Sequence, residues 1–346
     1  MRRITICCIV FLSAALACCK AQDVRRWSEG IPDWTGFHIS PPGDTTTSFA
    51  SFTLLKEKKS IRKARTTYRY MDVTGALLSY QSRVREDAMT ETELQAIRQD
   101  FNILEYYARQ LRNELLFTTD PERKLEQEYI ARFRTARDEA RKTGDYSPYR
   151  LTDDTFDITG IPFTPVPQFH GITIGLFTDI PFGDQGRLLY PTAGVAAALN
   201  FGRGRSSVQA EVDFGLSSYR LHLYGLRDKT IPYVGAFVYF RHELAATDRL
   251  CISLFGGPGY AARLLDRDEY RVRVGGPALR EGVSADLHLR RDISLGVRRP
   301  EQTDTFLQLR LAFGQLYNSS QHLVVPSINL AAGLYFQSRG IKGSQP

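Results

Sequence analysis

The C-terminal half of the chain alternates apolar and polar side chains through one segment after another. In the segment 208–216, Val208 and Val212 fall on one face of an extended chain and Glu211 and Asp213 on the other. Side chains of a strand alternate with period two, so the pattern predicts strands. Eight such segments follow one another, at 169–181, 192–202, 206–217, 232–244, 249–262, 282–295, 304–317 and 327–339. Together they predict an eight-stranded antiparallel barrel over residues 169–346.

The lengths of the strands and of their connections suit a membrane barrel. Strands of about 11–14 residues can cross a bilayer when tilted. The connections after the first, third, fifth and seventh strands are long, at 182–191, 218–231, 263–281 and 318–326. Those after the second, fourth and sixth are shorter, at 203–205, 245–248 and 296–303. Long outer loops and short periplasmic turns are typical of outer-membrane barrels, and an even strand number places the preceding domain in the periplasm.

Alternation alone leaves open which face of the barrel points outward. A membrane barrel turns its apolar face to lipid, whereas a soluble lipocalin-like ligand carrier would turn that face inward. Export, loop lengths and the lack of disulfides favour the membrane barrel. The charged residues of the polar face would then form a lumen network of Glu211, Asp213, Arg241, Glu243, Asp286, His288, Arg290 and Arg310. Eight strands leave room only for side chains, so we expect a filled barrel rather than a pore.

The N-terminus has the pattern of an export signal. Arg2 opens a charged start, the stretch 4–19 is apolar, and small residues allow cleavage after Ala17 or Ala21. We interpret residues 1–21 as a signal peptide.

The cysteines divide unevenly across this boundary. Four of the five fall within the signal, which leaves Cys251 alone in the processed chain and excludes an intrachain disulfide there. A lipoprotein form, with Cys18 or Cys19 lipidated, is an alternative.

Between the signal and the barrel the pattern changes to a mixture of strands and helices. Short strands are predicted near 45–53 and 66–82. Thr90 and Glu93 form a capping box before an apolar stripe with helical spacing. A second helix is predicted from residue 120 to Gly144. We expect an α+β periplasmic domain at 22–150 with a small sheet and two long helices, then a Pro-rich linker at 151–168, then the all-β transmembrane barrel.

The first helix resembles that of a known family. Residues 101–115, FNILEYYARQLRNEL, together with Trp27 and the stretch 33–37, resemble an uncharacterised exported family of zincin-like putative metallopeptidases. In that family the helix carries a His-Glu-x-x-His motif, whose histidines bind zinc and whose glutamate is the general base. The matching positions here are Ala96, Ile97 and Asp100, which cannot supply that chemistry. The resemblance therefore implies a degenerate, non-catalytic domain that binds no metal.

These observations define three functional hypotheses. The favoured one is a non-catalytic outer-membrane barrel of a Gram-negative bacterium, in contact with lipid and presenting a periplasmic domain to an unidentified envelope protein. The alternatives are an exported hydrolase that uses residues outside the lost motif, and the soluble carrier. We predict no cofactor. The net charge of +7 is scattered along the chain, so no nucleic-acid partner is expected. Asp100 and Glu105, five residues apart, are interpreted as solvated helix surface rather than a carboxylate pair.

Overall fold

The chain folds into two units that are interleaved along the sequence. The computed structural model describes residues 24–31, 33–41, 48–118, 122–152, 156–183, 190–218, 230–265, 272–296, 299–318 and 323–343. The predicted signal peptide, with Cys18 and Cys19, lies outside these ranges. We call residues 62–68, 162–293 and 301–346 the barrel unit, and residues 1–61, 69–161 and 294–300 the helical unit.

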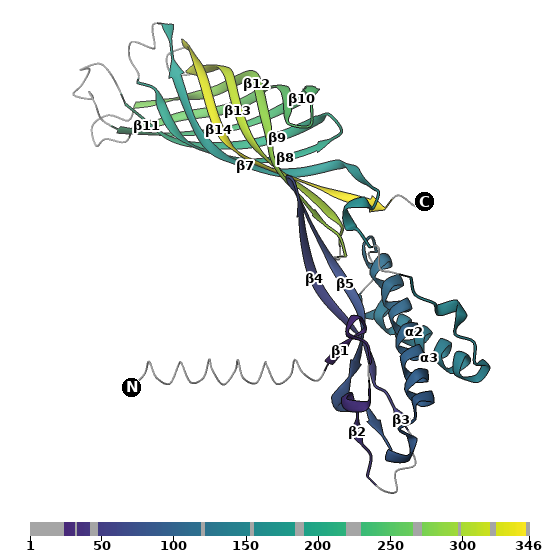
Figure 1. Ribbon diagram of the computed structural model, residues 1–346. Helices are drawn as coiled ribbons and strands as arrows, with labels where there is room; N and C mark the ends of the chain where they lie inside the picture. Colours follow the sequence, from purple (N-terminus) through teal and green to yellow (C-terminus); the bar gives the residue numbers. More distant parts are fainter. Residues whose placement is uncertain are drawn as a thin grey trace, which may run out of the picture. The chain divides into compact units, whose positions relative to one another are not determined.

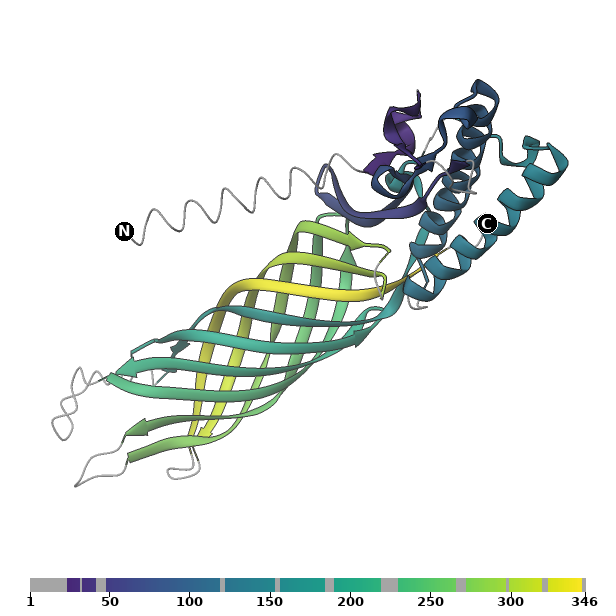
Figure 2. The ribbon, with the colours of Figure 1, turned by 90° about the horizontal axis from the view of Figure 1, so that it is seen from below.

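Eight strands close into a ring in the barrel unit (Figure 2). They are β7 (Phe163–Pro181), β8 (Thr192–Arg203), β9 (Ser206–Ser218), β10 (Thr230–Ala246), β11 (Leu250–Leu265), β12 (Val272–Ser294), β13 (Glu301–Asn318) and β14 (Leu323–Gly343). Each strand from β7 to β14 pairs with the next along the chain, and β14 pairs with β7 to complete the ring. All eight predicted strands are present, and most run further than the alternation indicated.

The apolar face of the barrel wall points outward. Leu199, Val212, Phe240 and Leu309 are 41–58% exposed, although all four are large and apolar. The inward face carries buried polar and aromatic side chains, among them Asn200, Gln209, Glu211, Asp213, Phe237, Tyr239, Asp286 and Gln308. A soluble ligand carrier would turn its apolar face inward. The observed arrangement is the reverse, and it contradicts that alternative.

The two ends of the barrel differ less in loop length than predicted. The turns 204–205 and 247–249 lie at the same end as Phe163 and Gly343, which pair with each other. We call this end the mouth. At the opposite end, β11 runs to Leu265 and β12 begins at Val272, both within the predicted long loop 263–281. Apolar-polar alternation is weak there, because Gly275, Gly276 and Pro277 interrupt it.

The helical unit contains short strands, one long hairpin and two helices (Figure 1). Its strands are β1 (Val24–Arg26), β2 (His38–Ile39), β3 (Ser48–Phe49), β4 (Phe52–Lys63), β5 (Thr66–Leu78) and β6 (Arg83–Val84), and its helices are α2 (Glu91–Leu115) and α3 (Glu122–Thr143). Short 3-10 turns occur at Trp27–Glu29, Trp34–Gly36, Ser79–Gln81, Glu86–Ala88, Ser147–Tyr149 and Ile158–Gly160. Strands β2, β6 and β3 form a separate small sheet.

Local signals account for the boundaries of the helices. The Thr90 side chain accepts a hydrogen bond from the Glu93 amide at 3.2 Å, as the capping pattern predicted. Gly144 ends α3 with φ of +73°, a conformation that favours glycine. The predicted start of α3 at residues 120–121 lies outside the described ranges. The apolar stripes of the two helices pack on β4 and β5 in one core that includes Leu54, Val73, Ile97, Leu104 and Phe133.

The predicted fold class, an α+β domain followed by a separate barrel, is wrong. The helices sit between strands, after β6 and before β7, and β1, β4 and β5 belong to the same eleven-stranded sheet as the barrel strands. The tip of the β4–β5 hairpin, residues 62–68, belongs to the barrel unit. There the Arg291 amide donates to the Arg65 carbonyl at 3.0 Å, on the edge of β12 beyond the end of β11. A long-range pairing of this kind leaves no periodic signal in the sequence.

The Pro-rich segment predicted as a linker at 151–168 also contains the start of a strand. β7 begins at Phe163 and passes through Pro165 and Pro167. On one side this stretch pairs with β14, with Pro165 opposite Ile341. On the other side, pairing with β8 extends only to Gln168. Proline has no amide hydrogen to donate to a neighbouring strand. It is tolerated on an unpaired strand edge because no neighbouring strand needs that hydrogen bond.

Close packing of β5 on α2 depends on one glycine. A Cβ added at Gly75 would meet Leu104 Cδ2 at 3.0 Å and the Glu105 backbone nitrogen at 3.3 Å. The Gly75 amide also donates to the Glu105 carboxylate at 2.8 Å. We expect Gly75→Ala to lower the free energy of unfolding of the helical unit by about 1–3 kcal/mol through overpacking. Both tryptophans, Trp27 and Trp34, lie in this unit, so tryptophan fluorescence during denaturation measures its stability.

The matched control for Gly75 is Gly160→Ala. Gly160 lies in the same unit, and a Cβ added there would meet nothing within 4 Å. We expect this control to unfold like the unaltered chain. An equal loss of stability in the two variants would show that contact between β5 and α2 does not set the cost.

Candidate functional site

The centre of the barrel lumen is filled by a cluster of charged and aromatic side chains. Arg280 donates to Asp213 at 2.8 Å and to the Tyr239 hydroxyl oxygen at 3.1 Å. Glu211 accepts from the Tyr239 hydroxyl at 3.2 Å and forms an ion pair with Arg310. All five residues are at most 7% exposed. The Arg280 guanidinium also lies 3.9 Å from the centre of the Phe237 ring. Every charge in this cluster therefore faces an opposite charge.

A second ion pair lies nearer the mouth. Arg241 pairs with Asp286 and donates to the Ser253 hydroxyl oxygen at 3.2 Å. Gln308 donates to the other oxygen of Asp286 at 3.0 Å. Strands β10, β11, β12 and β13 each contribute one of these residues, so the pair joins four strands across the interior.

A third ion pair lies toward the opposite end of the barrel. Arg263 and Asp179 are 3.7 Å apart, and both are buried. Asp179 accepts from the Ser327 hydroxyl at 2.8 Å, and Arg263 donates to the Thr192 hydroxyl oxygen at 3.3 Å. Paired charges therefore occupy the described lumen at three levels along its length.

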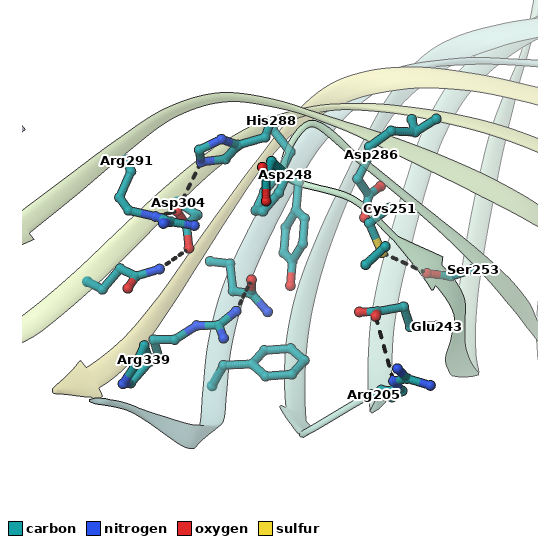
Figure 3. Close-up of a pocket in the computed structure, with 18 of the residues that line it drawn as sticks. Arg205, Glu243, Asp248, Cys251, Ser253, Asp286, His288, Arg291, Asp304 and Arg339 are labelled. Carbon is teal, nitrogen blue, oxygen red and sulfur yellow. Dashed lines mark hydrogen bonds and ion pairs between the residues drawn. The ribbon is translucent and has the colours of Figure 1, made fainter. Parts of the chain in front are cut away.

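A pocket of about 530 Å³ opens at the mouth (Figure 3). The turns after β8 and β10 and the mouth ends of β7 and β14 surround it. Its polar lining includes Arg205, Arg241, Glu243, His288, Asp304 and Arg339. Its aromatic lining is Phe163, Phe169, Phe306 and Tyr335. In Figure 3, His288 and Arg291 both point toward Asp304, and Arg205 toward Glu243.

Asp304 is the most heavily bonded carboxylate of the pocket. It is 2% exposed and interacts with Arg291 Nε at 2.7 Å, His288 Nε2 at 3.0 Å and Gln302 Nε2 at 2.5 Å. His288 also contacts the Phe306 ring, with centroids 5.3 Å apart. Three side chains therefore hold the Asp304 carboxylate in place, which favours a structural role.

The residues predicted for the lumen network occupy different places in the structure. Glu211, Asp213, Arg241, Asp286 and Arg310 are buried in the interior. In the mouth pocket His288 lines the wall, and Glu243 is half-buried with the Arg205 guanidinium at 4.0 Å.

Arg290, also predicted for the lumen network, is not buried in the interior. It is exposed and forms an ion pair with Asp292 at 2.8 Å. His288 and Arg291 lie three residues apart and both bond to Asp304, so the period-two alternation is broken between them. The break coincides with the place where β12 begins to pair with the tip of the β4–β5 hairpin.

Sequence reasoning missed Arg280, Arg263, Asp179 and Asp304 as lumen residues. Arg280 and Arg263 fell within the predicted loop 263–281. The signal for Arg280 was present, because residues 280, 284 and 286 share one parity and all three are buried. Extending the alternation of β12 toward its start would have found this residue.

The three positions that the sequence resemblance matches to a metallopeptidase motif lie on α2, in the helical unit. Ile97 is fully buried, as predicted from its place in the apolar stripe, and Ala96 is half-buried. Asp100 and Glu105 are only 1% and 3% exposed, so their interpretation as solvated surface was wrong. Asp100 forms an ion pair with Arg141 on α3 at 2.6 Å. Burial raises the pKa of Asp100, and Arg141 partly opposes the shift.

The described residues hold few other groupings of reactive side chains. Among the described residues, no three His, Cys, Asp or Glu side chains are grouped so that they could hold a metal ion. Cys251 interacts with Ser253 at 3.6 Å, and His288 with Asp304, but no described bond joins these two pairs. Neither described helix is both long enough and apolar enough to cross a membrane.

Comparison with known proteins identifies no family. No family model matches the chain. No curated protein matches it either. The resemblance of residues 101–115, Trp27 and the stretch 33–37 to the zincin-like family therefore stays a prediction.

Several solved structures are similar to part of the chain. The attachment invasion locus protein Ail of Yersinia pestis is 10% identical, covering 49% of this chain and 100% of that one, with a TM-score of 0.32. The N-terminal β-barrel domain of Pseudomonas aeruginosa OprF is 7% identical, covering 50% and 99%, with a TM-score of 0.30. Neisserial surface protein A is 8% identical, covering 50% and 97%, with a TM-score of 0.32. The barrel described above is established by its strand pairing, independently of these similarities.

Proposed function

We propose that this protein is a non-catalytic outer-membrane β-barrel that anchors its helical unit in the periplasm as an interaction platform. The observation that carries the proposal is the direction of the side chains. Large apolar residues such as Leu199, Phe240 and Leu309 are exposed around the barrel wall, whereas Glu211, Asp213 and Arg280 are buried inside it. An exposed apolar wall is unfavourable in water but favourable in a bilayer. The buried charged residues are stabilised because they pair with one another in the filled lumen.

The orientation in the membrane follows from the mouth. Residues 162, 293 and 301, where the chain leaves the barrel unit, adjoin strand ends at the mouth, as do the turns 204–205 and 247–249. In outer-membrane barrels the short turns face the periplasm. The mouth pocket and the helical unit would then both be accessible from the periplasm.

Fractionation tests this proposal. We expect the protein in the outer-membrane fraction, released by detergent but not by urea or carbonate. The folded barrel should also migrate differently on a gel before and after boiling. Recovery of the folded chain in the soluble fraction without detergent would contradict the membrane assignment.

The proposal of a non-catalytic helical unit rests on α2. With Ala96 and Ile97 at the motif positions, the helix offers neither two zinc ligands nor a general base. Ile97 also fills the core space beside Phe101 and Leu104.

Chelation provides the second test. We expect the purified full chain to carry less than stoichiometric zinc, and its tryptophan-monitored melting temperature to be unchanged by a chelator. About one zinc per chain, or a chelator-sensitive peptidase activity, would restore the hydrolase hypothesis.

A further inference from the structure

A groove of about 560 Å³ runs along the outer wall of the barrel across β7 to β11. Its size falls in the range of about 300–1,000 Å³ found for small-molecule sites. Its lining is mostly apolar and alternates small and large outward residues, among them Ala197, Leu199, Ala210, Val212, Ala236 and Val238. It also includes Glu211, whose side chain is buried in the lumen cluster. Strand pairing explains the hollow. Ala197 and Ala236 both lie opposite Val212, and Leu199 and Val238 both lie opposite Ala210, so the alanines lie between larger side chains.

Two arginines lie at the mouth end of the same strands. Arg203 ends β8 on the outer face, and Arg205 follows in the turn to β9. Both are exposed; the Arg205 side chain is 74% accessible and lies at the rim of the mouth pocket, with its guanidinium 4.0 Å from Glu243. Between Arg203 and Leu199 the outer face carries only Phe201, which is 59% exposed.

The two arginines and the apolar groove match the two parts of a lipid molecule, a charged headgroup and an apolar tail. At about 3.4 Å per residue, Leu199 lies about 14 Å along β8 from Arg203. That span is within the half-thickness of about 15 Å of a bilayer hydrocarbon core. A phosphate beside Arg203 and Arg205 would therefore place an acyl chain along Phe201 and into the groove beside Ala210.

We propose that this groove and the two arginines form a specific site for one phospholipid of the adjoining leaflet, with preference for an anionic headgroup. The inference rests on the proposed membrane location. Charge complementarity selects the headgroup, since guanidinium groups bind phosphate oxygens through charge-assisted hydrogen bonds. The row of alanines selects the tail, because larger side chains at those positions would fill the hollow.

Native mass spectrometry of the full chain, released from detergent micelles with added phosphatidylglycerol, tests the proposal. We expect one phosphatidylglycerol to stay bound, and phosphatidylcholine to be held more weakly. The double variant Arg203→Gln/Arg205→Gln should hold phosphatidylglycerol about tenfold more weakly, the loss expected for one charge-assisted hydrogen bond. Ala210→Leu, which fills the groove, should weaken both lipids.

Two control variants match these changes elsewhere on the barrel. Arg249→Gln removes an exposed arginine from the turn after β10, and Ala332→Leu enlarges an exposed alanine on β14. Neither should change lipid retention. The heat-dependent gel shift verifies that each variant is folded, and the arginine variant alone decides the matter if Ala210→Leu fails to fold.

The outcomes separate this inference from the membrane proposal. Equal retention in all variants would show lipid that is only annular, which overturns the specific site and leaves the membrane location intact. No retention by any variant, with a protein that stays soluble without detergent, would overturn both.

Discussion

Replacing Arg280 with methionine is expected to lower the free energy of unfolding of the barrel by about 3–5 kcal/mol, the usual cost of removing one partner of a buried ion pair. Arg280 donates to Asp213 at 2.8 Å and to the Tyr233 hydroxyl oxygen at 3.2 Å. Asp213 is fully buried, and Arg280 is its described ion-pair partner. Methionine would keep much of the volume but leave the carboxylate without its counter-charge.

The matched control is Arg290→Met, on the same strand. Arg290 is exposed, with 49% of its side chain accessible in the ion pair with Asp292 and a longer bond of 3.4 Å to the Thr67 hydroxyl oxygen. Exposed pairs contribute only about 0–1 kcal/mol. Denaturant unfolding in detergent, followed by the change in gel mobility, compares the two variants. Similar midpoints would show that the lumen cluster does not stabilise the barrel.

Arginine at Leu309 is expected to cost about 2–4 kcal/mol and to impair assembly, because it would place a charge near the bilayer midplane. Leu309 is 50% exposed and lies in the middle of β13, opposite Ala332. In water the same change would be nearly neutral, since the side chain already faces outward. The sign and size of the effect therefore depend on the surroundings of the barrel.

Leu244→Arg is the control for depth. Leu244 is equally exposed, at 52%, but lies near the mouth end of β10. Membrane barrels tolerate arginine near the interface at a cost of about 0–1 kcal/mol. The measured quantity is the amount of heat-modifiable protein in the outer membrane for each variant. Equal amounts for Leu309→Arg and Leu244→Arg would contradict a lipid-facing midplane at Leu309.

Period-two alternation was sufficient to predict the eight barrel strands, because one face of each strand is apolar and the other polar along most of its length. The pattern is local, and segments such as 206–217 carry it without interruption. The alternation failed to predict a strand where the difference between its two faces is lost. Around Gly275, Gly276 and Pro277 the alternation is interrupted, so β12 was predicted to begin ten residues after its observed start at Val272, and Arg280 was missed.

Alternation also could not show how strands pair over long distances. The tip of the β4–β5 hairpin bonds to the edge of β12. Beside this contact Arg290 is exposed and Arg291 donates to Asp304. In the sequence, Arg290 has the same alternation as the lumen residues before it on the same strand. Likewise, Asp100 and Glu105 were taken for surface because carboxylates usually are. Their burial depends on Arg141 from α3 and on the Gly75 amide from β5.

The most direct measurement of the central claim is the accessibility of nitroxide spin labels on the barrel wall. In a chain whose native cysteines are replaced by serine, a label is placed at Leu309 or at Leu244, and the protein is reconstituted into bilayers. We predict that the label at Leu309 collides often with oxygen, which concentrates in lipid, and rarely with a water-soluble nickel complex. The label at Leu244 should show the opposite preference. Frequent collision of the nickel complex with the label at Leu309 would show that the apolar wall faces water, and would contradict the account.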